Sequence, residues 1–167
     1  MNSKQQPTHH HYKNSVEMYS DGTYLEKNPS WGVEDSSWKA LQIQKLLIKN
    51  NLVPKNWAEI GCGAGEILKQ LSFSYPKATF TGYEVSPQAF KLAVSRQTEN
   101  IQFHLKNLLE ENLFFDCLLC IDVFEHVEDY LGFLRGLKNK AEYKVFHIPL
   151  DLSLLSILRN QMLIARS

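Results

Sequence analysis

Residues 56–65 read Asn-Trp-Ala-Glu-Ile-Gly-Cys-Gly-Ala-Gly, and this stretch decides the fold. Its first half is apolar enough for a short buried β-strand, and its second half places glycine at every other position. Glycine tolerates positive φ and has no Cβ, so a ligand can approach the backbone there. Apolar residues at helical spacing follow over residues 66–75, and Pro76 ends them. A strand, a glycine loop and a helix in this order predict a site for a carboxylate or phosphate at the helix N-terminus.

The alternation of strand and helix continues along the chain. Further strands are predicted over residues 78–84, 101–105, 115–121 and 142–148, and further helices beginning at Ser86 and spanning 126–138. Strands that alternate with helices require a parallel sheet with right-handed crossovers. The prediction is an α/β fold, a mainly parallel sheet of about five strands flanked by helices. Ligands of such sheets bind outside the carboxyl ends of the strands.

The segments on either side of this pattern differ from it. Residues 1–33 are polar and irregular and predict a flexible N-terminal segment. A helix is predicted over residues 34–52, and its apolar residues point in more than one direction, as in a lid helix covered on two sides. The ligand-binding domain is expected over residues 34–149, and residues 150–167 are expected to form a helical tail.

Composition excludes several classes of protein. Of 167 residues, Lys and Arg number 18 and Asp and Glu number 18, so no net positive charge favours nucleic acid. No apolar run is long enough for a membrane span, and no secretory signal precedes the domain, which predicts a cytoplasmic location. Three cysteines do not make a disulfide scaffold. Cys117 and Cys120 fall on opposite faces of one strand, so they are expected in the core and no metal site is predicted.

An acid at the end of the second strand indicates the kind of ligand. Glu84 can accept both hydroxyls of a ribose, so loop and acid together favour an adenosine ligand. Taken singly, the glycine loop could be a purely structural turn, and Glu84 could be a solvated acid at the end of a strand. NAD is disfavoured because Glu66 occupies the third glycine position of the dinucleotide pattern and would repel a pyrophosphate.

The pattern acid-x-G-x-G-x-G is complete over residues 59–65, and three further blocks follow it in order at 83–87, 115–116 and 121–127. With these blocks the sequence resembles the class I S-adenosylmethionine-dependent methyltransferases, in particular the small-molecule methyltransferase-domain group. The resemblance covers residues 55–148. It implies a Rossmann-like fold, S-adenosyl-L-methionine as cofactor and a small-molecule methyl acceptor.

The resemblance also implies roles for individual residues. Glu59 would hold the cofactor's amino group, the glycines its methionine and ribose portions, and Glu84 the ribose. Val85 would lie beside the adenine, Asn107 would stand where the family has an acid near the adenine amino group, and Asp122 would border the cofactor through its backbone. The full set of expected cofactor-binding residues is Glu59, Gly61, Cys62, Gly63, Gly65, Glu84, Val85, Asn107, Leu108 and Asp122.

Methyl transfer needs a general base only if the acceptor must lose a proton. His126 is the candidate catalytic residue, and a structural residue at a helix start is the alternative. His147, at the end of the last strand, could line the acceptor pocket or be packed. Aromatic residues of the N-terminal stretch, with Lys39, could close over the cofactor; they are Tyr19, Tyr24, Trp31 and Trp38.

The family pattern continues past the fifth strand, whereas this chain ends soon after it, so the fold is expected to be C-terminally shortened. The exposed edge of the fifth strand, or the tail helix, is then a candidate homodimer contact. Three hypotheses follow. They are a methyltransferase acting on oxygen or nitrogen of a small molecule, a catalytically silent cofactor-binding or interaction module, and a dinucleotide oxidoreductase.

Overall fold

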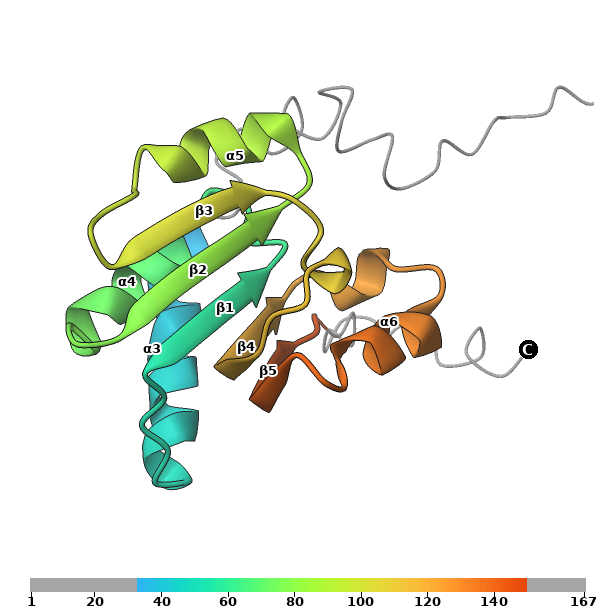
Figure 1. The fold of residues 1–167 in the computed structure, drawn as a ribbon. Helices are drawn as coiled ribbons and strands as arrows, with labels where there is room; N and C mark the ends of the chain where they lie inside the picture. Colours follow the sequence, from blue (N-terminus) through green and yellow to red (C-terminus); the bar gives the residue numbers. More distant parts are fainter. Residues whose placement is uncertain (1–32, 150–167) are drawn as a thin grey trace, which may run out of the picture.

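The computed structural model describes residues 33–149 (Figure 1). The predictions for the tail and for the N-terminal segment before Val33 lie outside these residues. The helices are α3 (Val33–Lys49), α4 (Glu66–Ser74), α5 (Pro87–Val94) and α6 (Tyr130–Leu137), with short 3₁₀ turns at Leu108–Glu110 and Phe124–His126. The strands are β1 (Asn56–Ile60), β2 (Thr79–Glu84), β3 (Ile101–Leu105), β4 (Phe115–Ile121) and β5 (Ala141–His147).

The five strands form one parallel sheet in the order β3-β2-β1-β4-β5. All five lie where the sequence predicts them, to within one residue. The chain runs outward from β1 to β3 and then returns to place β4 on the other side of β1, so the strand order reverses between β1 and β4. A crevice opens at such a reversal, at the carboxyl ends of the strands. In Figure 1, β5 lies at one edge of the sheet and β3 at the other.

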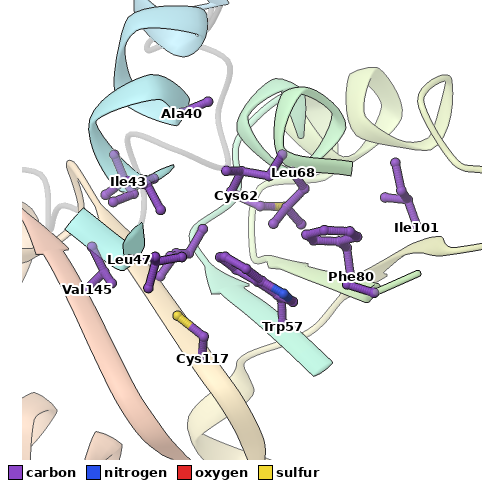
Figure 2. Packing of buried hydrophobic residues seen from close by; sticks show 14 of the residues in the cluster. Ala40, Ile43, Leu47, Trp57, Cys62, Leu68, Phe80, Ile101, Cys117 and Val145 are labelled. Atoms are coloured by element: carbon purple, nitrogen blue, oxygen red, sulfur yellow. The ribbon is translucent and has the colours of Figure 1, made fainter. Parts of the chain in front are cut away.

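The sheet is covered on both faces because its central strands are apolar on both sides. One core joins α3, α4 and α5 to the face that carries Trp57 and Phe80 (Figure 2). The second core joins α6 to the opposite face, which carries Tyr83 and Leu118. Cys117 belongs to the first core and Cys120 to the second, and both thiols are free and buried, as predicted.

Among the described residues, helix α3 is covered on one face, by the sheet and α4, whereas the sequence predicts a helix covered on two sides. Ala40, Ile43 and Leu47 are buried against the sheet and α4. The apolar side chains on its other faces, among them Leu41 and Ile48, remain exposed.

The helix predicted over residues 126–138 begins later, at Tyr130. The side chain of Asp129 accepts a hydrogen bond of 2.8 Å from the backbone N–H of Gly132 and caps the helix there. Asp is a strong N-cap and a poor interior residue, so the capping outweighs the helical spacing of the preceding apolar residues. Residues 124–126 form a 3₁₀ turn instead, which places His126 in a turn and not in a helix. The predicted start at Ser86 is confirmed, with Pro87 in the first turn.

None of the helices within residues 33–149 is long and apolar enough to cross a membrane.

Candidate functional site

A pocket opens at the carboxyl ends of β1, β2 and β4, where the strand order reverses, and the N-terminal half of α3 contributes part of its wall. It brings together most of the residues that the sequence singled out. The predicted residues that line it are Glu59, Gly61, Cys62, Gly63, Glu84, Val85, Asp122 and His126. These positions span more than 60 residues of sequence, so the sheet topology assembles them.

The glycine loop forms the floor of the pocket in a conformation that needs glycine. Gly61, Gly63 and Gly65 have φ angles of 65°, 54° and 76°, in the left-handed region that other residues rarely adopt. A Cβ on Gly61 would lie 2.5 Å from Cγ2 of Val123. The loop therefore presents backbone without side chains to the pocket at Gly61 and Gly63, and it lies close to the segment that follows β4.

Glu84 organises the loop from the end of β2. Its Oε2 accepts a hydrogen bond of 2.8 Å from the backbone N–H of Gly63, and its Oε1 accepts bonds of 2.8 Å from Val85 and Ser86. Burial raises the pKa of Glu84, against the opposing effect of these three N–H donors. A carboxylate has about four lone-pair positions, so it can still accept hydrogen bonds from a ligand.

Glu59 is the unusual group of the pocket. It lies on β1, is only 2% exposed, and its Oε2 has no hydrogen-bond partner among the described residues. Burial raises the pKa of Glu59 well above its ordinary value, and the nearby Glu84 and Asp122 carboxylates add to this, whereas Lys39 opposes it. A buried acceptor without a donor costs about 1–3 kcal/mol, so this position suits a ligand that brings a donor, above all a cationic one.

Asp122 joins three elements beside the pocket. Its Oδ2 accepts a hydrogen bond of 2.5 Å from Nζ of Lys39 on α3, and its Oδ1 lies 2.5 Å from Nδ1 of His147 at the end of β5. Burial acts to raise the pKa of Asp122, but Lys39 and His147 outweigh it and hold this pKa below its ordinary value. Asp122 has a positive φ of 54°, a conformation that Asp and Asn tolerate better than other residues with a side chain.

Three predicted residues do not line the pocket. The side chain of Asn107 accepts from the N–H of Leu109 and donates to Glu110, so it caps a 3₁₀ turn. Leu108 is fully buried in the core on the α6 side of the sheet. Gly65 is the N-cap residue of α4, and a Cβ there would lie 2.5 Å from the ring of Phe103.

Glu66 lines the pocket, but its charge is partly compensated. It pairs with Arg96 at 2.5 Å, and Gln70 donates a second hydrogen bond to it at 2.7 Å. These partners, despite partial burial, keep the pKa of Glu66 below its ordinary value. The repulsion of a pyrophosphate by Glu66 is therefore weaker than the sequence alone implies.

Cys62 lies in the wall of the pocket, but its thiol faces the core. The Sγ atom would be 2.7 Å from a Cβ on Gly82, and burial raises the pKa of Cys62 well above its ordinary value. A protonated, buried thiol is a poor nucleophile. Within the described part of the chain, no three His, Cys, Asp or Glu side chains come together in a way that could hold a metal ion.

The sequence did not reveal the contact of Lys39 and His147 with Asp122. It named Lys39 only as a residue that could close over the cofactor and His147 only as a strand-end residue. The available signal was the helical spacing of Lys39 with buried Ser36 and Ile43, which turns this lysine toward the pocket. Trp38 packs edge-on against His147, with ring centroids 6.1 Å apart, and is itself more than half exposed. The other predicted aromatic residues, Tyr19, Tyr24 and Trp31, lie outside the described residues.

A glycine loop at a strand reversal, with an acid at the end of the neighbouring strand, is typical of Rossmann-like domains that bind an adenosine ligand, and the class I methyltransferases are one such class. Residues 58–141 match the family model described as "Methyltransferase domain". The chain belongs to this family, which confirms the resemblance drawn from its motifs.

Two curated relatives are the malonyl-[acyl-carrier protein] O-methyltransferases of Bacillus cereus and Bacillus anthracis. Each is 30% identical to this chain over 84 residues, which make up 47% of this chain. The chain spans only 30% of the length of these relatives.

Solved structures share the fold. The magnesium protoporphyrin IX methyltransferase of Synechocystis, crystallised with S-adenosylhomocysteine, has a TM-score of 0.69 at 14% identity, covering 91% of this chain and 78% of its own. The N-methyltransferase NodS of Bradyrhizobium japonicum has a TM-score of 0.57 at 22% identity, covering 80% and 72%. At these identities the likeness establishes the Rossmann-like methyltransferase fold and no more.

Proposed function

We propose that the chain binds S-adenosyl-L-methionine in this pocket and transfers its methyl group to oxygen or nitrogen of a small-molecule acceptor. The observation that carries the proposal is Glu59, a buried carboxylate whose Oε2 has no donor among the described residues and which lines the pocket beside the glycine loop. The ammonium group of the cofactor's methionine portion is a cationic donor of the kind that this oxygen lacks.

The remaining residues suit the other parts of the cofactor. Lys39 is a cation in the pocket wall for the methionine carboxylate, and Glu84 can accept the ribose hydroxyls while it holds Gly63. Val85 is half exposed at the end of β2 and offers an apolar surface to the adenine. The roles predicted for Asn107, Leu108 and Gly65 require the cofactor to contact residues outside the pocket wall. Asn107 would also have to give up its present hydrogen bonds.

The charge of the pocket favours this cofactor over NAD. The acids in its wall are Glu59, Glu66, Glu84 and Asp122, whereas Lys39 is the only Lys or Arg among the described lining residues. S-adenosylmethionine carries a sulfonium and an ammonium against one carboxylate, whereas NAD carries two negative charges on its pyrophosphate against one positive charge on its nicotinamide ring. Since opposite charges attract more strongly where water is excluded, an acidic pocket selects the first ligand.

The cofactor supplies an activated methyl group on a sulfonium, so the protein needs to contribute mainly alignment and exclusion of water. The bare glycine loop gives close contact, and the acids hold the ligand at both ends. His126 lines the pocket with a side chain that is 38% exposed, and it stays a candidate base.

The proposal extends to the bounds of the domain, its cellular location and its partners. We propose residues 34–149 as the cofactor-binding domain, with α3 as its lid. A cytoplasmic location is proposed from the three free thiols. The zero net charge disfavours nucleic acid as a partner, and the outer edge of β5, which is unpaired within the described sheet, supports a homodimer contact.

A second candidate is a cofactor-binding module without catalysis. Such a module would bind the cofactor but would not transfer the methyl group to any acceptor.

Calorimetric titration of the purified chain with S-adenosylmethionine, S-adenosylhomocysteine and NAD tests the proposal. We expect micromolar binding of the first two and no binding of NAD. Glu84→Gln, which keeps one acceptor oxygen, should weaken binding, whereas Glu99→Gln at an exposed acid should not. Tight binding of NAD alone, or unchanged affinity in Glu84→Gln and Glu84→Ala, would show that the site is wrong.

A further inference from the structure

His147 is fixed in place by the strand next to it. Ile121 of β4 pairs with His147 of β5, and the backbone N–H of the following residue, Asp122, donates to the carbonyl oxygen of His147 at 3.1 Å. The side chains meet as well, with Nδ1 of His147 2.5 Å from Oδ1 of Asp122. Trp38 packs against the imidazole from α3. Main chain, carboxylate and indole thus restrict both the position and the rotation of the ring.

The carboxylate also determines which ring nitrogen carries the proton. Lys39 and His147 keep the pKa of Asp122 low, so this group is ionised at neutral pH and can only accept hydrogen bonds. Nδ1 must therefore be the donor in the 2.5 Å contact. In the neutral imidazole the lone pair is then left on Nε2. No partner for Nε2 lies within residues 33–149.

The ring stands at the border of two hollows. His147 lines a second, mostly apolar hollow, whose other lining residues are Lys39, Gln42, Ile43, Leu46, Ile121, Val145 and Phe146. Lys39 and Ile121 line both this hollow and the cofactor pocket, so the two adjoin across the Lys39–Asp122 ion pair. The His147 side chain is 35% exposed, so a solute can reach it. The charged groups that face it among the described residues are Asp122 from β4 and Lys39 from α3, one of each sign.

We propose that this second hollow is the acceptor site and that His147 is the general base, which makes the acceptor an apolar molecule with a hydroxyl or N–H group rather than a carboxylate. The inference rests on the proposed function. For a hydroxyl acceptor, the O–H bond breaks and its proton moves to the Nε2 lone pair. The oxygen keeps the electron pair of that bond and joins the methyl carbon, as the C–S pair returns to sulfur. The imidazolium that forms is stabilised by Asp122.

His126 does not share this arrangement. It sits in a 3₁₀ turn rather than at a strand end, and it lines the cofactor pocket but not the second hollow. A base whose tautomer is set by a carboxylate is better prepared to accept a proton. Asp122 acts here as a positioning residue.

The tautomer can be measured without any acceptor. Two-bond ¹H–¹⁵N spectra of the histidine side chains of the full chain, with His147→Gln for assignment, should show Nδ1–H and a bare Nε2 in the neutral form of His147. Asp122→Asn, which keeps the tolerance for positive φ, should shift His147 toward the Nε2–H form, because an amide can donate to Nδ1. His104→Gln, on β3 outside both hollows, is the matched control and should leave the His147 signals unchanged. An Nε2–H tautomer in the unaltered chain would overturn the inference.

The hydroxyl acceptor is tested with ring compounds that carry either a hydroxyl or a carboxylate. Phenol, catechol and cyclohexanol are the hydroxyl probes, and benzoate and cyclohexanecarboxylate are the carboxylate probes, each with methyl-labelled S-adenosylmethionine. We expect methylation of a hydroxyl probe and none of the carboxylates. His147→Gln should lower kcat at least about 100-fold and abolish the fall of kcat toward acid pH, at unchanged affinity for S-adenosylhomocysteine.

Methylation of the carboxylates alone, or a His147→Gln enzyme with the original pH profile, would refute the role of His147 as general base. The hydroxyl acceptor would be refuted by a chain that binds the cofactor but methylates no hydroxyl probe. In addition, that chain would show no shift of the His147 ¹⁵N signals when a hydroxyl probe is added with S-adenosylhomocysteine. If the chain fails to bind S-adenosylmethionine at all, the proposed function is what fails, while the tautomer result still stands by itself.

Discussion

Replacing Glu59 by Gln should stabilise the free protein and at the same time weaken its binding of S-adenosylmethionine. Glu59 is 2% exposed, and its Oε2 has no donor among the described residues. Burial first, and then the Glu84 and Asp122 carboxylates, raise the pKa of Glu59, so the folded state keeps the proton to a higher pH than the unfolded chain. The stability that this protonation provides is complete below the ordinary pKa of the carboxyl and is lost as the pH rises through the folded-state pKa.

The change in Tm and the loss of cofactor affinity in Glu59→Gln can be estimated from this. Gln mimics the protonated acid at every pH, so Glu59→Gln and the unaltered chain should have the same Tm near pH 4 and diverge toward neutral and alkaline pH. A buried polar group without a partner costs about 1–3 kcal/mol, and a charged one costs more. The amide of Gln keeps the first cost and removes the excess due to the charge, which is taken to be of the same order. At about 2–4 °C per kcal/mol for a chain of this size, the variant should gain about 2–12 °C. Loss of a hydrogen bond between charged groups should weaken cofactor binding about 10- to 100-fold.

The assay is thermal unfolding followed by circular dichroism from pH 4 to pH 9, with and without S-adenosylmethionine, paired with calorimetric titration. Glu99→Gln removes an exposed acid and serves as the control, with no change expected in Tm or affinity. A Glu59→Gln protein that is less stable than the unaltered chain at neutral pH would refute the idea of an orphaned acceptor. Unchanged cofactor affinity would refute the role of Glu59 in binding.

Three further predictions concern the loop and the core. Glu84→Ala leaves the backbone N–H groups of Gly63, Val85 and Ser86 without their acceptor and should lower the free energy of unfolding by about 2–4 kcal/mol; an unchanged urea midpoint would contradict this. Gly61→Ala places a Cβ 2.5 Å from Cγ2 of Val123 at a φ of 65° and should cost about 1–3 kcal/mol. Adding Val123→Ala should recover part of that cost in a double-mutant cycle, and strict additivity would exclude the clash. Burial raises the pKa of both Cys117 and Cys120 to about 12, so iodoacetamide at pH 8 should leave both unlabelled in the folded protein and label both in urea, as mass spectrometry can show.

Local chemistry explains which parts of the fold the sequence predicts. The strands alternate or are continuously apolar, and Ser86 with Pro87 marks a helix start by its own side chain and ring. The glycines of the loop indicate backbone with positive φ, because other residues rarely adopt that conformation. These signals depend on a residue and its immediate neighbours, so they need no knowledge of the sheet order. The late start of α6 escaped prediction because two local signals competed there, and the Asp129 cap outweighed the apolar spacing.

The structure alone determines which distant residues meet. Lys39 reaches Asp122 across 83 residues of sequence, and His147 reaches it across 25, because α3 packs on the sheet and β5 pairs with β4. Asn107 shows the opposite outcome, since its place after β3 suggested a ligand contact while its side chain is used in capping a turn. The sequence by itself determined the glycine loop, the acids at the strand ends and the parallel sheet, since each follows from local preference. The pocket, the orphaned oxygen of Glu59 and the oriented His147 depend on strand order and helix packing, which are long-range consequences of burying the apolar faces together.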